Sequence, residues 1–509
     1  AAAELAPLVR QAQVLAMQFD AVVANPPYIG SKFHLSVLKK YLEKNYLGYE
    51  KDIFSAFIDR NFEFAKPQGC LGFMSPQVWM FLSSFEVIRT RLIDQATITS
   101  LIQPEYNAFW DSAHVTICSY LVQKAHIANY SGTFIRLTDF YGADLQPIKT
   151  LEAIANPDCG WLYRVRPDDL KSIPGSPIAY WAAPAVRKAF RYGIPLERVA
   201  KAMKGLDTCD NDRFLRLWSE ISLDETSLVS TTCKQAQDSG KRWFPYCKGG
   251  GFRRWAGNYS YLVEWEDDGR TLRNLRTPDG RIKSRPQNTS YYFSNGVTFS
   301  SVTSAIFSAR AMSNAVFGGG GSAIFPERQY LFLGLLNSTI NLYFMGLLNP
   351  TLNVLVGDLG NVPVVSNVHE NKIEAIVKRL VEISVADWDA YERSWNFQSF
   401  PFLRDTNNPI VTLESCYVAW HAQSRNTIAM MKGLEEDCNR LFIEAYSLGA
   451  DLTPSVPIEQ VTVTVNPAYR YGIKLTDDEQ WARFRQDSHE ELISYAIGCM
   501  MGRYSLDAP

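Results

Sequence analysis

Residues 19–28, FDAVVANPPY, decide how the first part of the chain folds. The apolar run at 21–24 has the length and composition of a buried strand in a parallel sheet. Asn25, Pro26 and Pro27 end this run, because proline has a fixed backbone angle and no N–H to donate. The sequence therefore predicts a buried strand that closes in a rigid turn.

Strand and helix patterns alternate after this turn. An alternation of this kind predicts an α/β fold with an open sheet, and it continues to about residue 155. The expected elements are helices at about 34–47, 52–65 and 85–94 and strands at 70–75, 99–103 and 114–123.

The charge of the chain is unevenly distributed. The 509 residues are 46% hydrophobic and 20% charged, which excludes a disordered chain, a collagen and a small disulfide scaffold. The net charge of −2 divides into −2 for residues 1–160 (13 basic, 15 acidic), +9 for residues 161–330 (25 and 16) and −9 for residues 331–509 (13 and 22). The basic middle indicates a nucleic-acid partner.

Cysteine and histidine are sparse and unpatterned. The nine cysteines form no C-x-x-C pair, and the six histidines show no metal-ligand spacing. We therefore expect reduced thiols and no metal site. No run of eighteen apolar residues and no signal-peptide pattern is present, which predicts a cytoplasmic protein without a membrane partner.

The turn from Asn25 to Tyr28 has chemistry suited to methylating an exocyclic amine. The N6 amine of adenine is a poor nucleophile because its lone pair is delocalised into the ring. The side-chain oxygen of Asn25 and the backbone carbonyl of Pro26 can accept its two hydrogens, and the prolines hold both acceptors in place. Tyr28 offers an aromatic face to a base flipped out of a duplex. The alternative is an ordinary strand-ending turn, which Asn-Pro sequences favour.

Several stretches together resemble a known family. FDAVVANPPY, residues 52–80 and NAFWDSAHVTICSYLVQK (107–124) are similar to amino-type DNA adenine-N6 methyltransferases of the TaqI and type IIG group. KGLDTCDNDRFLRLW (204–218), SAIFSAR (304–310) and residues 491–509 extend the likeness over the whole chain. The best match is to the PglX-type adenine-specific methyltransferases of type 1 BREX phage-defence systems.

The resemblance implies roles for residues near the turn. The implied catalytic residues are Asn25, Pro26, Pro27 and Tyr28, of which Asn25 and Pro26 also contact the cofactor, S-adenosylmethionine. Ser75, Pro76 and Trp79 are implied to lie near the pocket. Phe109 is implied as the second aromatic that stacks on the base together with Tyr28, with Trp110 or Phe85 as alternatives.

In this family a Gly-rich turn ahead of the NPPY motif holds the cofactor. Only 24 residues precede Asn25, and none of them resembles such a turn. We therefore expect the chain to be a piece of a longer enzyme, to lack the cofactor-binding half, and to bind the cofactor weakly by itself. The run Gly318–Gly321 is expected to be a flexible loop.

The resemblance also implies three regions. These are the second half of a Rossmann-like methyltransferase sheet in a partial catalytic domain (1–155), a mixed α+β target-recognition domain (156–365) and a mainly helical region (366–509). Eleven Lys and Arg at 241–285, against five acids and interleaved with aromatics, suit a DNA-facing surface, although a solvated basic face is the alternative. The candidate DNA contacts are Asn211, Arg213, Lys241, Arg242, Trp243, Lys248, Arg253 and Arg254.

The implied function is site-specific N6-adenine methylation of double-stranded DNA in the bacterial cytoplasm, which marks host DNA as self. Other BREX proteins and phage-encoded DNA-mimic inhibitors are the further partners implied. Two alternatives stay open: a non-catalytic DNA-recognition or scaffold module of the same defence system, and glutamine methylation of a protein, which also uses an NPPY turn. The basic middle segment argues against the second.

Overall fold

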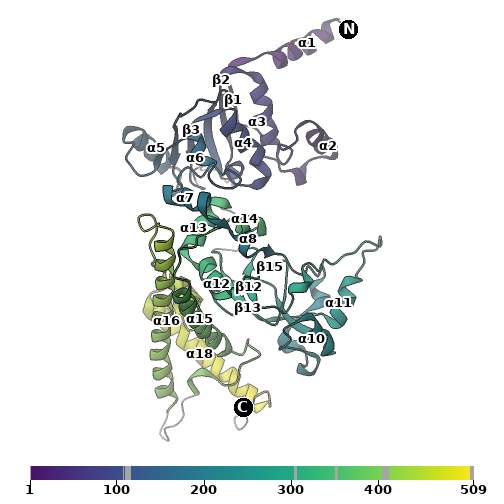
Figure 1. Cartoon of the computed structure of the whole chain (residues 1–509), viewed down its shortest axis with the longest axis vertical. Coiled ribbons are helices and arrows are strands. Elements are labelled where there is room, and N and C mark those ends of the chain that lie inside the picture. Colours follow the sequence, from purple (N-terminus) through teal and green to yellow (C-terminus); the bar gives the residue numbers. More distant parts are fainter. Residues whose placement is uncertain are drawn as a thin grey trace. The chain divides into compact units, whose positions relative to one another are not determined.

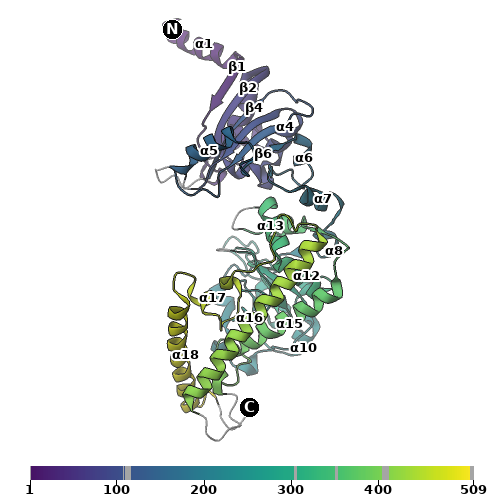
Figure 2. The same ribbon diagram turned by 90° about the vertical axis from the view of Figure 1, so that its left-hand side faces the viewer.

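The computed structural model describes residues 2–106, 108, 116–302, 306–349, 353–403 and 412–504. Its internal contacts divide the chain into two compact units (Figures 1 and 2). Unit 1 holds residues 1–192 and 347–350, and unit 2 holds residues 193–346 and 351–509. Each unit is described by itself.

Unit 1 contains a six-stranded sheet. Its strands are β1 (Phe19–Ala24), β2 (Ala65–Pro76), β3 (Thr97–Gln103), β4 (Ile117–Gln123), β5 (Gly132–Arg136) and β6 (Leu162–Val165). They lie in the order β1-β2-β4-β3-β5-β6. β1 is parallel to β2 and β3 to β5, whereas β4 is antiparallel to both β2 and β3. The carboxyl ends of β1, β2, β3 and β5 therefore meet at one edge of the sheet, and the predicted α/β class is confirmed.

Helices of unit 1 pack on this sheet and complete its core. α3 contacts β1 and β2, and α4 contacts β3. Phe54 and Ile58 of α3 are buried in one cluster with Leu71 and Phe73 of β2 and Leu101 of β3. The helices are α1 (Ala2–Ala16), α2 (Ser36–Asn45), α3 (Ile53–Phe64), α4 (Glu86–Asp94), α5 (Leu145–Ala155), α6 (Pro167–Leu170) and α7 (Pro184–Tyr192).

β1 is not the buried strand that the sequence predicts. Its residues alternate between exposed and half-buried, and Val23 is 83% exposed. β1 lies at the edge of the sheet, where β2 is its one neighbour among the described strands. An apolar run predicts a strand. Whether that strand is buried depends on the elements that cover it, and the local sequence does not specify these elements.

Unit 2 begins with two small sheets of four strands each. Their orders are β14-β10-β11-β9 and β13-β12-β15-β8. The strands of unit 2 are β7 (Ile194–Pro195), β8 (Ala202–Met203), β9 (Leu215–Leu217), β10 (Trp243–Cys247), β11 (Tyr261–Glu264), β12 (Gly296–Ser300), β13 (Ala309–Met312), β14 (Val316–Phe317), β15 (Gly321–Ile324) and β16 (Pro363–Val364).

Long helices follow the sheets, as the sequence predicts. α12 and α16 both pack on α15, and α18 packs on α16 through Phe484 and Trp420, whose rings are 5.2 Å apart. The helices are α8 (Leu196–Val199), α9 (Asn211–Phe214), α10 (Cys233–Asp238), α11 (Glu266–Arg273), α12 (Gln329–Asn337), α13 (Thr339–Leu348), α14 (Val356–Gly360), α15 (Glu370–Asp389), α16 (Leu413–Ala445), α17 (Pro467–Tyr471) and α18 (Asp477–Met500). Among the described residues no single helix has the length and hydropathy of a membrane span, and only the bent pair α12 and α13 meets those criteria, by length and composition alone.

The run Gly318–Gly321 is not the flexible loop predicted above. Its residues join β14 to β15, and the N–H of Gly319 donates to the carbonyl of Leu206 at 3.2 Å. A Cβ on Gly321 would lie 2.2 Å from the carbonyl oxygen of Cys247. The glycines are needed because backbone segments cross here in direct contact.

Candidate functional site

The NPPY turn lies at the carboxyl end of β1, beside the carboxyl end of β2. Ala24 pairs with Phe73 in the parallel ladder, so the turn begins next to Met74. The Tyr28 hydroxyl donates to Oδ1 of Asn25 at 2.6 Å and lies 3.3 Å from the Met74 carbonyl. Asn25 is exposed and Tyr28 is half-buried. The structure thus brings the predicted acceptor and the predicted aromatic face together.

Tyr28 stays protonated in this position. Burial raises the pKa of its phenol, and the nearby Cys118 thiol raises it further. The hydroxyl is therefore a donor at neutral pH, and it points the oxygen of the Asn25 amide toward the tyrosine. An amide oxygen has two lone pairs. Asn25 can accept an incoming amine hydrogen while it keeps the bond to Tyr28.

Ser75, Pro76 and Trp79 lie behind the turn, at the end of β2. Ser75 and Trp79 are fully buried, and the ring of Trp79 lies 4.8 Å from that of Tyr120. Burial raises the pKa of the neighbouring Cys118 thiol to about 12, so it is neutral. Tyr28 packs against the core cluster that contains Trp79, and direct contact of Ser75, Pro76 or Trp79 with a substrate stays a prediction.

The second aromatic of the predicted base sandwich is not placed. Phe109 and the alternative Trp110 lie outside the described residues. The other alternative, Phe85, is 5% exposed and packs against Phe54 with ring centroids 5.4 Å apart. Phe85 is therefore a core residue.

Asp52 fastens the residue that follows the turn, a role that sequence reasoning missed. Its Oδ1 accepts the N–H of Ile29 at 3.0 Å and the N–H of Phe54 at 3.3 Å. The carbonyl of Ile29 lies 2.8 Å from Nε2 of His34. Asp52 thus caps α3 and ties that helix to the end of the turn. An Asp ahead of an apolar helix is a visible capping signal, but its second partner is 23 residues away.

The described residues provide only part of a site for S-adenosylmethionine. Asn25 and Pro26 lie at the carboxyl edge of the sheet, where ligands of open α/β sheets bind. Gly318–Gly321 leads into the strand β15, so its N–H groups do not form the helix N-terminus on which Gly-rich cofactor turns depend.

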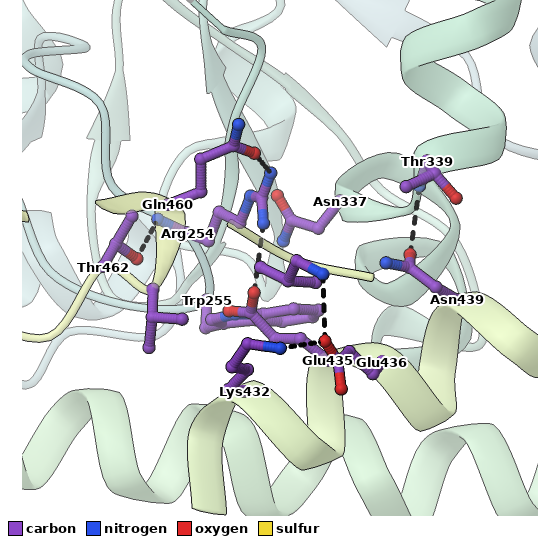
Figure 3. Close-up of polar contacts among 12 residues, drawn as sticks. Arg254, Trp255, Asn337, Thr339, Lys432, Glu435, Glu436, Asn439, Gln460 and Thr462 are labelled. Carbon is purple, nitrogen blue, oxygen red and sulfur yellow. Dashed lines mark hydrogen bonds and ion pairs between the residues drawn. The ribbon is translucent and has the colours of Figure 1, made fainter. Parts of the chain in front are cut away.

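Arg253 and Arg254, two of the predicted DNA contacts, are buried, so this prediction is wrong for both. They are 2% and 3% exposed. Arg253 pairs with Asp387 at 2.9 Å. Arg254 pairs with Glu435 at 3.1 Å (Figure 3). Their carboxylate partners lie 134 and 181 residues further along the chain, which is why a local basic pattern does not reveal them.

The pair of Arg254 and Glu435 is the centre of a polar network (Figure 3). The indole N–H of Trp255 donates to Glu435 at 2.6 Å, and Arg254 also donates to the side chain of Gln460 at 3.2 Å. The backbone N–H of Arg254 donates to Thr462 at 2.9 Å. Burial raises the pKa of Glu435, against the lowering effect of Arg254. The network ties the basic segment to α16.

Trp243 is also buried, at 4% exposure in β10, so its predicted contact with DNA is wrong too. The remaining candidates reach the surface but do not form one cluster. Arg242 and Lys248 flank opposite ends of β10, about 20 Å apart at the rise of a strand. The candidates that stay accessible are Asn211, Arg213, Arg242 and Lys248, which are exposed, and Lys241, which is half-buried.

A hairpin at residues 276–282 presents further cations. Arg276 and Ile282 form an antiparallel bridge, and the N–H of Thr277 donates to the carbonyl of Arg281 at 2.8 Å. The side chain of Arg281 is 84% exposed, and Ile282 is 59% exposed. The sequence pattern included these cations in the basic segment but did not single out the hairpin.

Comparison with known proteins agrees with the resemblance predicted from the sequence. Residues 6–109 match the family model of the Eco57I restriction-modification methylase. The chain is 34% identical over its full length to the adenine-specific methyltransferase BrxX of Escherichia coli O9:H4 (strain HS), and 31% identical over 99% of its length to the adenine-specific methyltransferase PglX of Lacticaseibacillus casei (strain Zhang). It spans 40% and 41% of the length of these relatives. The predicted resemblance to PglX-type methyltransferases is confirmed.

Solved structures of restriction-modification enzymes are also similar. A nuclease-deletion mutant of the Type ISP enzyme LlaGI, in complex with a DNA substrate mimic, matches with a TM-score of 0.42 and 13% identity, over 74% of this chain and 42% of that one. The Type IIL enzyme MmeI in complex with DNA matches with a TM-score of 0.42 and 12% identity, over 85% of this chain and 57% of that one.

Proposed function

We propose that this chain is the base-binding and target-recognition part of a site-specific DNA adenine-N6 methyltransferase that marks host DNA in a bacterial BREX phage-defence system. The observation that carries the proposal is the NPPY turn at the carboxyl edge of the sheet, with the Asn25 oxygen held by Tyr28 at 2.6 Å. The resemblance along the whole chain to proteins named adenine-specific methyltransferases supports it.

In this proposal Asn25 and Pro26 bind the target amine. The amide oxygen of Asn25 and the carbonyl of Pro26 accept the two N6 hydrogens, which draws the nitrogen lone pair out of conjugation with the ring. Tyr28 packs its ring against the flipped base, and its hydroxyl donates to the amide oxygen of Asn25, which keeps a second lone pair for the amine. Asp52 holds the far end of the turn through Ile29. S-adenosylmethionine supplies the methyl group when it is bound.

The sheet of unit 1 supports the finer fold proposal. In this sheet β1 and β2 are parallel, and the antiparallel β4 lies between β2 and β3. We assign this arrangement to the second half of a Rossmann-like methyltransferase sheet. The sequence predicts a catalytic part at 1–155, and we extend it to residue 192 because β6 and α7 belong to unit 1. We propose 193–365 as the target-recognition region and 366–509 as the helical region. The buried ion pairs of Arg253 and Arg254 give the helical region a role, because they hold the recognition segment in place.

We propose that exposed cations of unit 2 bind DNA phosphates. Arg213, Arg242 and Lys248 are accessible, and the 276–282 hairpin adds Arg276 and Arg281. The buried Arg253 and Arg254 are not part of this surface. In the bacterial cytoplasm this surface would also be the target of phage-encoded DNA mimics, and other BREX proteins are further proposed partners.

Asn25→Ala in the full-length protein tests the proposed function. We expect transfer of a tritiated methyl group from S-adenosylmethionine to DNA to fall by about 100-fold or more, the loss typical of removing one preorganised hydrogen-bonding group. Affinity for DNA, measured by fluorescence anisotropy, stays within about threefold because Asn25 contributes little phosphate binding.

The matched control is Asn45→Ala, which removes an exposed asparagine at the end of α2 and leaves methylation unchanged. Full methylation by Asn25→Ala contradicts the catalytic role of the turn. DNA binding by the wild-type protein without any methyl transfer favours the non-catalytic recognition module.

A further inference from the structure

Residues 161–192 of unit 1 carry a basic groove that contains none of the DNA contacts named above. Residues 161–192 contain six Lys and Arg against two Asp, a net charge of +4. Five of the six cations line an open groove of about 770 Å³ that ends on α7. We call this feature the α7 groove. Its lining cations are Arg166, Lys171, Arg187, Lys188 and Arg191.

Two aspartates organise part of the α7 groove without neutralising it. Asp169 lies 3.7 Å from Arg166 and 3.4 Å from Arg187, and Asp168 lies 3.5 Å from Lys171. Lys171 also reaches Asp94 at 2.7 Å. The five lining cations against the two lining aspartates and Asp94 leave a local charge of +2.

α7 directs its remaining cations outward. Val186 and Phe190 are buried on the inner face of this helix, whereas Lys188 and Arg191 are exposed. Neither cation has a carboxylate within ion-pair distance among the described residues of the chain. An amphipathic helix with this division presents two free charges, one helical turn apart, to whatever fills the groove.

The spacing of the cations along the groove favours a polyanion as the partner. Its cations are spread along an open surface and are not gathered around an enclosed cavity, so a single small anion would remain hydrated and weakly held. A polyanion gains affinity from such a surface because several contacts together release its condensed counterions. The NPPY turn lies in the same unit, and in the proposed function it binds a base that belongs to a duplex.

We propose that the α7 groove binds the phosphate backbone of the DNA whose base enters the NPPY turn, with Lys188 and Arg191 as the principal contacts. The inference rests on the proposed function and adds a second DNA-binding surface, in unit 1. Arg187 and Arg166, held by Asp169, extend the surface on either side. These contacts carry no sequence information, because phosphates are the same at every base. The groove positions the duplex, and recognition of the target sequence lies elsewhere.

The test is the salt dependence of DNA binding by the full 509-residue chain, measured by fluorescence anisotropy with a labelled 30-base-pair duplex. Each phosphate contact contributes about 0.9 to the slope of log K against log salt. For Lys188→Ala/Arg191→Ala we expect the slope to fall by about 1.8. The loss of affinity between 50 and 200 mM salt then becomes about 12-fold smaller than in the wild type, by the same relation.

Two controls separate charge from folding and from net charge. Lys188→Arg/Arg191→Lys keeps both charges and retains the wild-type slope. Lys372→Ala/Lys474→Ala removes two exposed lysines of unit 2 and leaves the slope unchanged. A wild-type slope in Lys188→Ala/Arg191→Ala overturns the inference and leaves the proposed function intact. Absence of DNA binding by the wild-type chain overturns both.

Discussion

Glu435→Gln tests whether the buried ion pair between Arg254 and Glu435 holds the basic segment against α16. Glu435 is 2% exposed and accepts hydrogen bonds from Arg254 at 3.1 Å and from the Trp255 indole at 2.6 Å. Glutamine keeps the shape of the side chain and an acceptor for the indole, but it leaves the buried guanidinium without a counter-charge. Breaking a buried ion pair in this way costs about 3–5 kcal/mol. Since a domain is stable by about 5–15 kcal/mol, we expect a large loss.

The assay is urea unfolding followed by tryptophan fluorescence, with the free energy of unfolding extrapolated to water. Glu444→Gln, an exposed position of the same helix α16, is the matched control and is expected to change stability by less than about 0.5 kcal/mol. The double variant Arg254→Met/Glu435→Met removes both charges together. It should lose less than the sum of the two single Met variants, because neither buried charge is left unpaired.

Two results would refute this reasoning. If the free energy of unfolding of Glu435→Gln lies within about 0.5 kcal/mol of the wild-type value, which is the usual effect of a surface substitution, the ion pair does not anchor the segment. If the two Met substitutions are simply additive, Arg254 and Glu435 do not interact.

Three further predictions concern other parts of the chain. Asp52→Ala should lower the free energy of unfolding by about 1 kcal/mol, because α3 loses its cap, and should also reduce the methylation rate constant. Asp52→Asn should restore both, because the amide oxygen of asparagine accepts the same two N–H groups. An Asn variant that is no better than the Ala variant refutes this role of Asp52. Gly321→Ala should lower the free energy of unfolding by about 1–3 kcal/mol, because the new Cβ lies 2.2 Å from the carbonyl oxygen of Cys247. In the control Gly251→Ala the new Cβ has no atom within 4 Å, so the free energy of unfolding should not change. Equal effects of the two substitutions would contradict the close backbone crossing at Gly321. The hydrogen bond from Arg328 lowers the pKa of Glu374 below its ordinary 4.5, so this pair stabilises the fold at neutral pH and loses that contribution as the pH falls below 4.5. A Glu374→Gln variant whose stability differs from that of the wild type equally at pH 3 and pH 7 argues against this.

The sequence predicts the parts of this structure that depend on local pattern. The strands at 70–75 and 99–103 and the helix at 85–94 are all found, because apolar periodicity and helix-breaking residues act over a few neighbours. The turn at residues 25–28 is found at the carboxyl end of its strand for the same reason.

The features that the sequence misses depend on distant partners. The sequence pattern predicts that Arg253 contacts DNA, but in the structure Arg253 pairs with Asp387 at 2.9 Å. The pattern also predicts that Gly318–Gly321 is a flexible loop, but in the structure Gly321 lies against the backbone of Cys247. Val23 is exposed because β1 has a single neighbouring strand among those described. Each case is decided by residues far away in the chain, which neither periodicity nor composition encodes.

The most direct test of the central claim is the identity of the methylated product. Duplex DNA is incubated with the full-length protein and S-adenosylmethionine, digested to nucleosides and analysed by mass spectrometry, in parallel with the Asn25→Ala variant. We expect N6-methyladenine with the wild type and none with the variant. Methyl label on glutamine of a protein, on cytosine, or on neither DNA nor protein would contradict it.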